Sequence, residues 1–171
     1  MIETVTLERG HKKQRATLEN LAQFYIHDFT DFLGPERPIH VNEDGLYPDA
    51  MVLKRYWTEP DRSVWFIRAD GHMAGFALLN KVTHSGEPAD FNMAEFFVLR
   101  PFRGKDVAER AVIDILHRHP GRWEVAIMER NTPALRFWPR AVQRASIRNY
   151  ESQSGVGENP SRTLLRFLAG S

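Results

Sequence analysis

Cysteine is absent from this 171-residue sequence, which excludes disulfide bonds, thiolate metal ligands and a cysteine nucleophile. Long apolar runs are absent too: none reaches the roughly 18 residues of a membrane span, and residues 1–9 contain no signal-peptide core. We therefore expect a soluble, cytoplasmic protein that does not contact a membrane. The formal net charge of +1 gives no overall attraction for nucleic acid, which we do not expect as a partner.

Several catalytic motifs are missing as well. The histidines and carboxylates form no His-Glu-x-x-His pattern, so we predict no metal site. The sequence also lacks a Gly-x-Ser-x-Gly elbow and a Walker phosphate loop. What is present is an ordinary globular composition, 42% hydrophobic and 26% charged, with enough residues to build one domain over 1–171.

Hydrophobic periodicity predicts an α/β fold. Helical spacing is expected from about residue 12 to 33, at 48–57, from 107 to about 118, and briefly after 132. Strands are expected at 2–8, 63–68, 73–79, 91–99, 123–128, 147–150 and 163–168. Asp70-Gly71 between two apolar runs is a strong hairpin signal. Together these elements predict a single domain with a mixed, twisted central sheet flanked by about four helices.

The segment after the predicted strand at 91–99 has the features of an anion site. A short basic turn at 100–105 leads directly into an amphipathic helix. This order presents backbone N–H groups and the positive end of a helix dipole to one point, an arrangement that binds pyrophosphate. Gly104 lets the backbone approach phosphate oxygens, and Arg103 and Lys105 add positive charge.

Two motifs resemble the GNAT superfamily of N-acetyltransferases. Residues 103–108, Arg-Gly-Lys-Asp-Val-Ala, are similar to its acetyl-coenzyme A loop Gln/Arg-x-x-Gly-x-Gly/Ala, with Asp106 where the family has its central glycine. Residues 131–138, Asn-Thr-Pro-Ala-Leu-Arg-Phe-Trp, fit its downstream Asn-x-x-Ala-x-x-Phe pattern. The resemblance at residue level covers 94–141, and the order of the predicted elements resembles the family over the rest of the chain.

This resemblance implies acetyl-coenzyme A as co-substrate, bound by a core at about residues 90–141. The residues that would contact it are Phe97, Val98, Arg103, Gly104, Lys105, Asp106, Val107, Ala108, Asn131, Ala134, Phe137 and Trp138. In the family, main-chain N–H groups hold the pyrophosphate, and the asparagine that corresponds to Asn131 bonds the pantetheine arm or its neighbourhood. Trp138 stands where many relatives have a tyrosine that protonates the leaving thiolate. Because an indole cannot usefully release a proton, packing in the core is the other role open to Trp138.

The implied reaction is acetyl transfer to an amine, which requires a base because only the unprotonated amine attacks a thioester. Glu95 is the candidate base, since a lone carboxylate in an apolar strand is desolvated and its pKa rises. The alternatives are a paired structural carboxylate and a strand-end residue that faces the wall of a cleft. Main-chain groups near Val98 would polarise the thioester carbonyl, as in the family. Without a cysteine, direct attack in a ternary complex is expected.

The acceptor side is predicted at the end of the first long helix, where Tyr25, His27 and Asp28 lie. Tyr25 could also replace the missing acid. Adjacent helix residues do not face each other, so His27 and Asp28 form no dyad, and a surface histidine is the alternative for His27. The acceptor amine could belong to a small molecule or a protein. An exposed strand at 163–168 would also permit pairing with a second copy as a homodimer.

Asp106 and Trp138 keep a second class of function open, a non-catalytic module of the same fold that binds a ligand or partner without turnover. A carboxylate about 4 Å from a phosphate costs about 4 kcal/mol at an effective dielectric of 20, and about 1 kcal/mol when hydrated. An outward-pointing Asp106 paired with Arg110 would instead leave weakened binding. Transfer of a larger acyl group is a third possibility.

Overall fold

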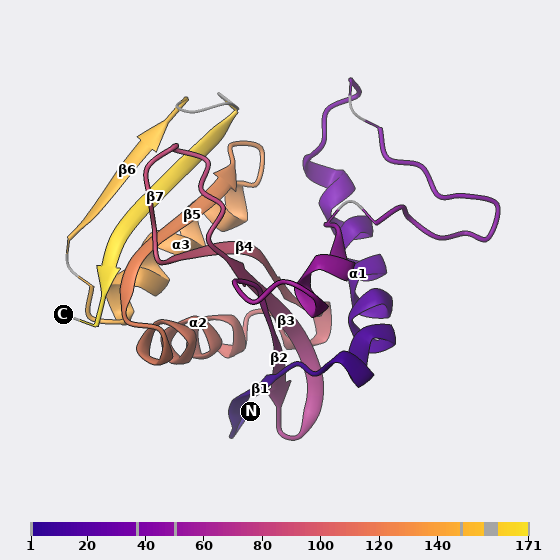
Figure 1. Cartoon of the computed structure of the whole chain (residues 1–171), viewed down its shortest axis with the longest axis horizontal. Coiled ribbons are helices and arrows are strands. Elements are labelled where there is room, and N and C mark those ends of the chain that lie inside the picture. Colours follow the sequence, from indigo (N-terminus) through magenta and orange to yellow (C-terminus); the bar gives the residue numbers. More distant parts are fainter. Residues whose placement is uncertain (1, 37, 50, 148, 156–160, 171) are drawn as a thin grey trace.

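The computed structural model describes residues 2–36, 38–49, 51–147, 149–155 and 161–170 (Figure 1). Its strands are β1 (Val5–Arg9), β2 (Ser63–Ala69), β3 (His72–Asn80), β4 (Phe91–Val98), β5 (Gly121–Met128), β6 (Tyr150–Ser154) and β7 (Arg162–Ala169). Its α-helices are α1 (Arg15–Phe29), α2 (Val107–Arg118) and α3 (Thr132–Arg144). Short 3₁₀ segments are η1 (Lys12–Gln14), η2 (Thr30–Phe32), η3 (Leu53–Trp57) and η4 (Arg100–Phe102).

All seven strands form one sheet in the order β1-β2-β3-β4-β5-β7-β6. Neighbouring strands are antiparallel except β4 and β5, which are parallel and are joined through α2. This pair is short: Phe91 to Met93 pair with Trp123 to Val125, and the register goes no further. The mixed sheet confirms the predicted fold class.

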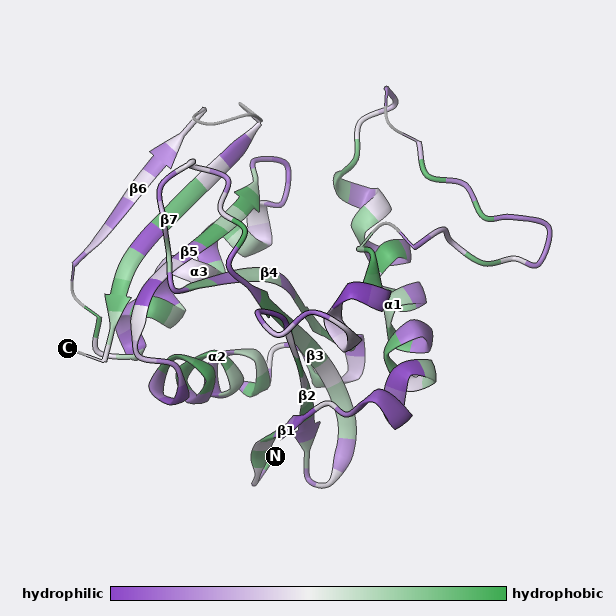
Figure 2. Ribbon diagram, viewed as in Figure 1, coloured by the Kyte–Doolittle hydropathy of each residue, from purple (hydrophilic) through white to green (hydrophobic). Residues whose placement is uncertain are grey.

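The two faces of the sheet carry separate cores, because successive strand residues point to opposite sides. Helices α2 and α3 cover one face, whose core includes Trp65, Met93, Ile115 and Trp123. Helix α1 covers β2 to β4 on the other face, whose core includes Leu18, Phe66, Phe76 and Phe97. Figure 1 shows α1 on the opposite side of the sheet from α2 and α3, and Figure 2 shows hydrophobic residues concentrated in the central strands.

The second predicted helix, at 48–57, is wrong in kind, since only the five-residue 3₁₀ segment η3 forms there. Val52, the residue before it, has a φ of 51°, a left-handed conformation that stops a continuous α-helix. The carboxylate of Asp49 accepts the Leu53 N–H at 2.9 Å and holds this turn. Three α-helices and four 3₁₀ segments therefore stand in the described residues, where about four helices were expected.

The predictions for the last two strands also need correction. The strand expected at 147–150 is β6 at Tyr150–Ser154, and residue 148 lies outside the described residues. Strand β7, expected as an exposed strand, lies between β5 and β6, so the prediction that 163–168 is free to pair with a second copy is wrong. The outer strands of the sheet are β1 and β6, and the homodimer itself stays a prediction.

Candidate active site

The centre of the site is the place where β4 and β5 separate. Beyond Met93, β4 continues to pair with β3 as far as Val98, but no longer with β5. The Leu99 N–H donates to Ala74 O at 2.8 Å. Because antiparallel ladders alternate, the N–H and C=O of Val98 point the other way, to the side that β5 has left. The Val98 amide therefore faces the opening between the strands.

The basic turn closes one end of this opening. Gly104 and Asp106 have positive φ angles of 69° and 59°. Asp106 is the N-cap of α2 and has a left-handed backbone, which would suit glycine and which aspartate tolerates better than most other residues. The first N–H groups of α2, from Val107 and Ala108, have no acceptor within the helix and remain for an anion.

Arg103 is fixed by three contacts. Its Nε donates to Val98 O at 2.7 Å, its guanidinium lies 5.5 Å from the Phe97 ring centre, and its Nη2 pairs with Asp28. Arg100 Nη2 lies 2.6 Å from the other Asp28 oxygen. Desolvation works in the opposite direction, but the hydrogen bonds from Arg100 and Arg103 hold the pKa of Asp28 below its ordinary value.

Asp28 is therefore tied to the anion loop through Arg100 and Arg103. His27 is exposed, and its Nδ1 lies 3.0 Å from the Tyr47 hydroxyl. The pairing considered for Asp106 and Arg110 is not found among the described residues, where the Arg110 guanidinium donates to Glu3 O at 3.0 Å.

Helix α3 lines the other side of the β4–β5 opening. Asn131 caps it, accepting the Ala134 N–H at 3.1 Å. Phe137 stacks on Phe96 of β4 with ring centres 6.0 Å apart, and buried Trp138 meets Phe96 edge-on at 5.5 Å. Trp138 thus packs in the core, the alternative role considered for it.

Glu95 projects from the opposite face of β4, toward α1. The Tyr25 hydroxyl donates a short hydrogen bond to its carboxylate. Desolvation raises the pKa of Glu95 to about 7, although the hydrogen bond from Tyr25 and the charge of Arg162 both lower it. Burial and the adjacent Glu95 raise the pKa of Tyr25 well above its usual value. At neutral pH the pair holds one carboxyl group that exchanges a proton readily and one phenol that keeps its proton.

A separate chain of buried polar side chains joins η3 to the end of β3 and the start of β4. The Tyr56 hydroxyl accepts from Asn80 at 3.1 Å, and Asn80 accepts from Asn92 at 2.9 Å. Desolvation, opposed by the bond from Asn80 and reinforced by the charge of Glu95, raises the pKa of Tyr56. Arg62 lies 5.2 Å from the Tyr56 ring centre. Sequence reasoning missed Tyr56, because no local pattern separates it from other aromatic residues in its segment.

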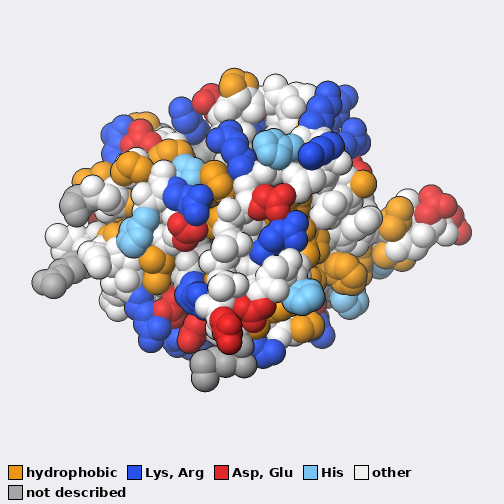
Figure 3. Space-filling model, turned by 90° about the horizontal axis from the view of Figure 1, so that it is seen from below, with side chains coloured by type: hydrophobic (Ala, Val, Ile, Leu, Met, Phe, Trp, Pro, Cys, Tyr) orange, Lys and Arg blue, Asp and Glu red, His pale blue; other side chains and the backbone are white. Residues whose placement is uncertain are grey.

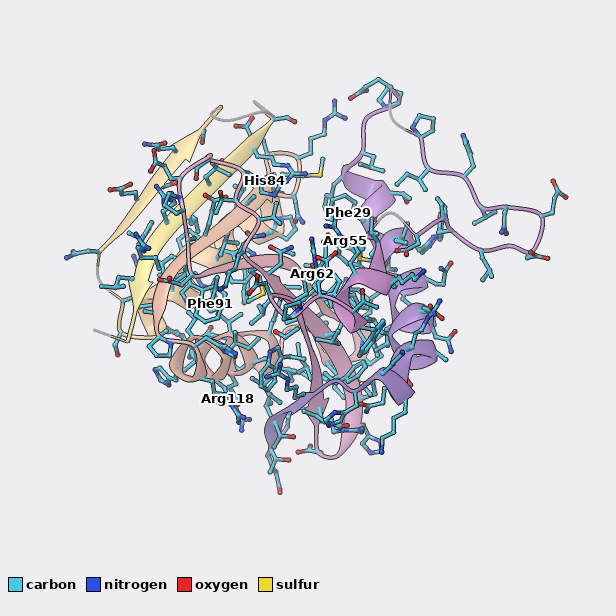
Figure 4. All side chains as sticks on the ribbon, viewed as in Figure 1. Phe29, Arg55, Arg62, His84, Phe91 and Arg118 are labelled. Carbon is cyan, nitrogen blue, oxygen red and sulfur yellow. The ribbon has the colours of Figure 1, made fainter. Side chains whose placement is uncertain are left out.

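Arg162 completes the site from β7 and was also missed, since nothing near it in the sequence relates it to β4. It begins β7 opposite Met128, at the end of β5. Its Nη1 contacts both ring nitrogens of His84, at 3.2 and 2.9 Å. In Figure 4, His84 lies over the β5–β7 half of the sheet and Phe29, at the end of α1, lies across from it.

A hollow of about 420 Å³ lies beside α1, lined by Gln23, Ile26, Tyr47 and Met51 among others. The described residues contain no group of three or more His, Asp or Glu placed to hold a metal ion. No helix among them is long and apolar enough to cross a membrane. On the face seen from below in Figure 3, charged side chains of both signs are interspersed.

The sequence profile of the acetyltransferase (GNAT) family matches residues 20–142, so the chain belongs to this family. No curated protein matches the sequence. Solved structures share the fold at low identity. An acetyltransferase from Thermus thermophilus has a TM-score of 0.66 and 14% identity, covering 98% of each chain. A GNAT-family acetyltransferase from Streptococcus agalactiae has a TM-score of 0.68 and 13% identity, covering 100% of this chain and 99% of its own.

A third structure is spermidine N-acetyltransferase from Vibrio cholerae in complex with CoA and spermine. Its TM-score is 0.54 and its identity 11%, covering 95% of this chain and 92% of its own. The recognised family and the fold class are thereby confirmed. The roles of individual site residues remain predictions.

Proposed function

We propose that this protein transfers an acetyl group from acetyl-CoA to a primary amine by direct attack in a ternary complex. The observation that carries the proposal is Glu95, a carboxyl group with a pKa of about 7 on the strand whose main chain faces the β4–β5 opening. Family membership supports the donor, and the Vibrio cholerae neighbour, in complex with CoA and spermine, combines this fold with a CoA site.

The donor would lie between β4 and β5. The amides of residues 103–108 and the N-terminus of α2 would bind its pyrophosphate, with the left-handed Asp106 keeping the loop open to phosphate. Asn131, Ala134 and Phe137 on α3 would flank the pantetheine arm. The Val98 N–H would donate to the thioester oxygen and stabilise the negative charge that develops there.

Glu95, as a carboxylate, would accept a proton from the substrate ammonium. The freed nitrogen would then bond to the thioester carbon, and the C–S bond would break with its electron pair leaving on sulfur. The second proton, which the nitrogen loses in becoming an amide, would pass to the departed thiolate. A thiol pKa of about 8.5 lets the thiolate leave without an acid, so Trp138 need not supply a proton. Tyr25 orients the carboxyl group of Glu95 and is the nearest phenol able to return a proton.

The first test is calorimetric titration of acetyl-CoA into the protein, with desulfo-CoA as a comparison, where we expect micromolar affinity, about 8 kcal/mol. Amine acetylation should then rise with pH through about 7, as Glu95 loses its proton. Glu95→Gln should lower the rate at least a hundredfold, with Glu151→Gln on β6 as the matched control. No acetyl-CoA binding at millimolar concentration would contradict the proposal and favour a non-catalytic module. An unchanged pH profile in Glu95→Gln would remove Glu95 as the base.

A further inference from the structure

One cation in the proposed acceptor site, Arg162, has no ion-pair partner among the residues that the structure describes. Arg103 is paired with Asp28, Arg62 Nε lies 2.6 Å from Glu59, and Arg166 Nε lies 3.7 Å from Glu124. Arg162, by contrast, forms no ion pair with any residue that the structure describes. Its Nε is buried and has no hydrogen-bond acceptor within those same residues.

Arg162 and Glu95 share one face of the sheet. Along β7, Leu165 and Phe167 point to the core beneath α2 and α3, so Arg162, an odd number of positions from each, points to the opposite face, where α1 lies. Glu95 projects to that face as well, and the charge of Arg162 is felt by both Glu95 and Tyr25. The two side chains therefore lie on opposite sides of the β4–β5 opening, Glu95 on β4 and Arg162 on β7 next to the end of β5.

The described surroundings of the Arg162 guanidinium hold it in place without forming an ion pair with it. His84 meets Nη1 from the loop between β3 and β4. That loop is itself anchored, because buried Glu124 accepts the His84 N–H at 2.5 Å and also the Ser85 hydroxyl. A guanidinium that is partly buried, positioned and without a counter-ion is stabilised by an anion that reaches it, and its planar fork matches a carboxylate.

We propose that the acceptor is a small amine bearing a carboxylate, such as a free amino acid, with its carboxylate on Arg162 and its amino group on Glu95. This inference rests on the proposed acetyl transfer and names the substrate class of the same site. It also predicts what the site rejects. A polyamine would bring a second positive charge toward Arg162, which repels it, so this chain should differ from a spermidine acetyltransferase in its acceptor.

The test compares each of a panel of amino acids with its own amide as acetyl acceptor, because the two differ only in the anionic group. We expect kcat/KM for the best amino acid to exceed that of its amide at least tenfold, with spermidine poorer still. Arg162→Gln should abolish this preference, so that kcat/KM for the amino acid falls to that of its amide measured with the same variant. Arg162→Lys should restore part of it, because it keeps the charge and loses the fork. Arg118→Gln, at the exposed end of α2, is the matched control.

Calorimetry gives a second readout that needs no turnover. With CoA present, the N-acetylated amino acid should bind wild type at least tenfold more tightly than its amide, and equally weakly in Arg162→Gln. Amides or polyamines acetylated as well as amino acids would overturn this proposal while leaving acetyl transfer standing. Failure to bind acetyl-CoA would instead overturn the proposed function, and the acceptor assignment with it. Circular dichroism on both Arg162 variants checks that they fold.

Discussion

Two carboxylates on neighbouring strands show how one residue type acquires two roles. Glu124 on β5 is fully buried, yet it accepts the His84 N–H and the Ser85 hydroxyl and lies 3.7 Å from Arg166 Nε. Glu95 on β4 has one hydrogen-bond donor among the described residues, the Tyr25 phenol. Glu124 holds the β3–β4 loop through the hydrogen bonds from His84 and Ser85, and Arg166 lies near its charge. Glu95 is a desolvated carboxyl group with a pKa of about 7.

The difference lies in the partners and not in the local sequence. Glu124 stands in Trp-Glu-Val-Ala-Ile and Glu95 in Ala-Glu-Phe-Phe-Val, so each is a lone carboxylate in an apolar strand. Two hydrogen-bond donors and the charge of Arg166 compensate the desolvation of Glu124, whereas one neutral phenol and the charge of Arg162 compensate that of Glu95 only in part. A carboxylate left under-solvated in this way is the one able to exchange protons near neutral pH.

The contrast between the two carboxylates is tested most directly by replacing each of them with glutamine in a separate variant. Glu124→Gln removes the charge from a buried cluster that contains Arg166, and we expect a loss of about 3 kcal/mol in the free energy of unfolding. Glu95→Gln should instead stabilise the protein at pH 8, by about 2 kcal/mol, because the desolvated charge is gone. Urea unfolding of both variants measures the two changes.

The pH dependence of the free energy of unfolding is a second test of whether the Glu95 charge destabilises the folded state. Because folding raises the pKa of Glu95 from 4.5 to about 7, the folded state binds the proton more tightly, and its contribution to stability declines as pH rises through that interval. The difference between wild type and Glu95→Gln should therefore be small at pH 4.5 and full at pH 8. A difference independent of pH, or a destabilised Glu95→Gln at pH 8, would contradict the contrast with Glu124.

A smaller effect is expected when the single partner of Glu95 is removed. Tyr25→Phe deletes a hydrogen bond that lowers the pKa of Glu95, so the midpoint of the pH–rate profile should move above about 7. At pH 7 the rate should fall about threefold to tenfold and recover at higher pH. Tyr150→Phe on β6 is the control. A rate loss that is constant across pH would indicate that Tyr25 acts as an acid instead of tuning Glu95.

The smallest effect concerns the anion loop, where Asp106 stands at φ 59°. Asp106→Gly should bind acetyl-CoA about fivefold more tightly, since a hydrated carboxylate near a phosphate costs about 1 kcal/mol. Unfolding free energy should change by less than about 0.5 kcal/mol, because relief of the left-handed strain offsets the greater entropy of the unfolded glycine chain.

Asp106→Asn separates charge from shape in that loop, since asparagine also tolerates a left-handed backbone. Calorimetry should show Asp106→Asn binding acetyl-CoA nearly as tightly as Asp106→Gly if the charge is the cause. Affinity that improves only in Asp106→Gly would assign the effect to the Cβ. Affinity unchanged in both would mean that the carboxylate does not face the phosphates.

Much of the fold could be predicted locally. Helix α2 buries Val107, Ala111, Val112, Ile115 and Leu116 at helical spacing, as its apolar stripe predicts. Asp70-Gly71 makes the β2–β3 hairpin. The segment 48–57 could not be predicted, because the left-handed Val52 and the Asp49 turn depend on how that loop packs and not on apolar spacing.

The sequence by itself determined the strand–turn–helix order around residues 103–108 and the isolation of Glu95 in an apolar strand, because turn chemistry and hydrophobic periodicity are local properties. Only the tertiary structure decided that Tyr25 reaches Glu95, that Glu124 accepts hydrogen bonds from the β3–β4 loop, and that Arg162 lies across the opening without an ion-pair partner among the described residues. Tyr25 and Glu95 are 70 positions apart in the chain, and Glu124 lies 40 positions from the His84 N–H that it accepts. Desolvation and charge pairing depend on distance in space, which chain position does not specify.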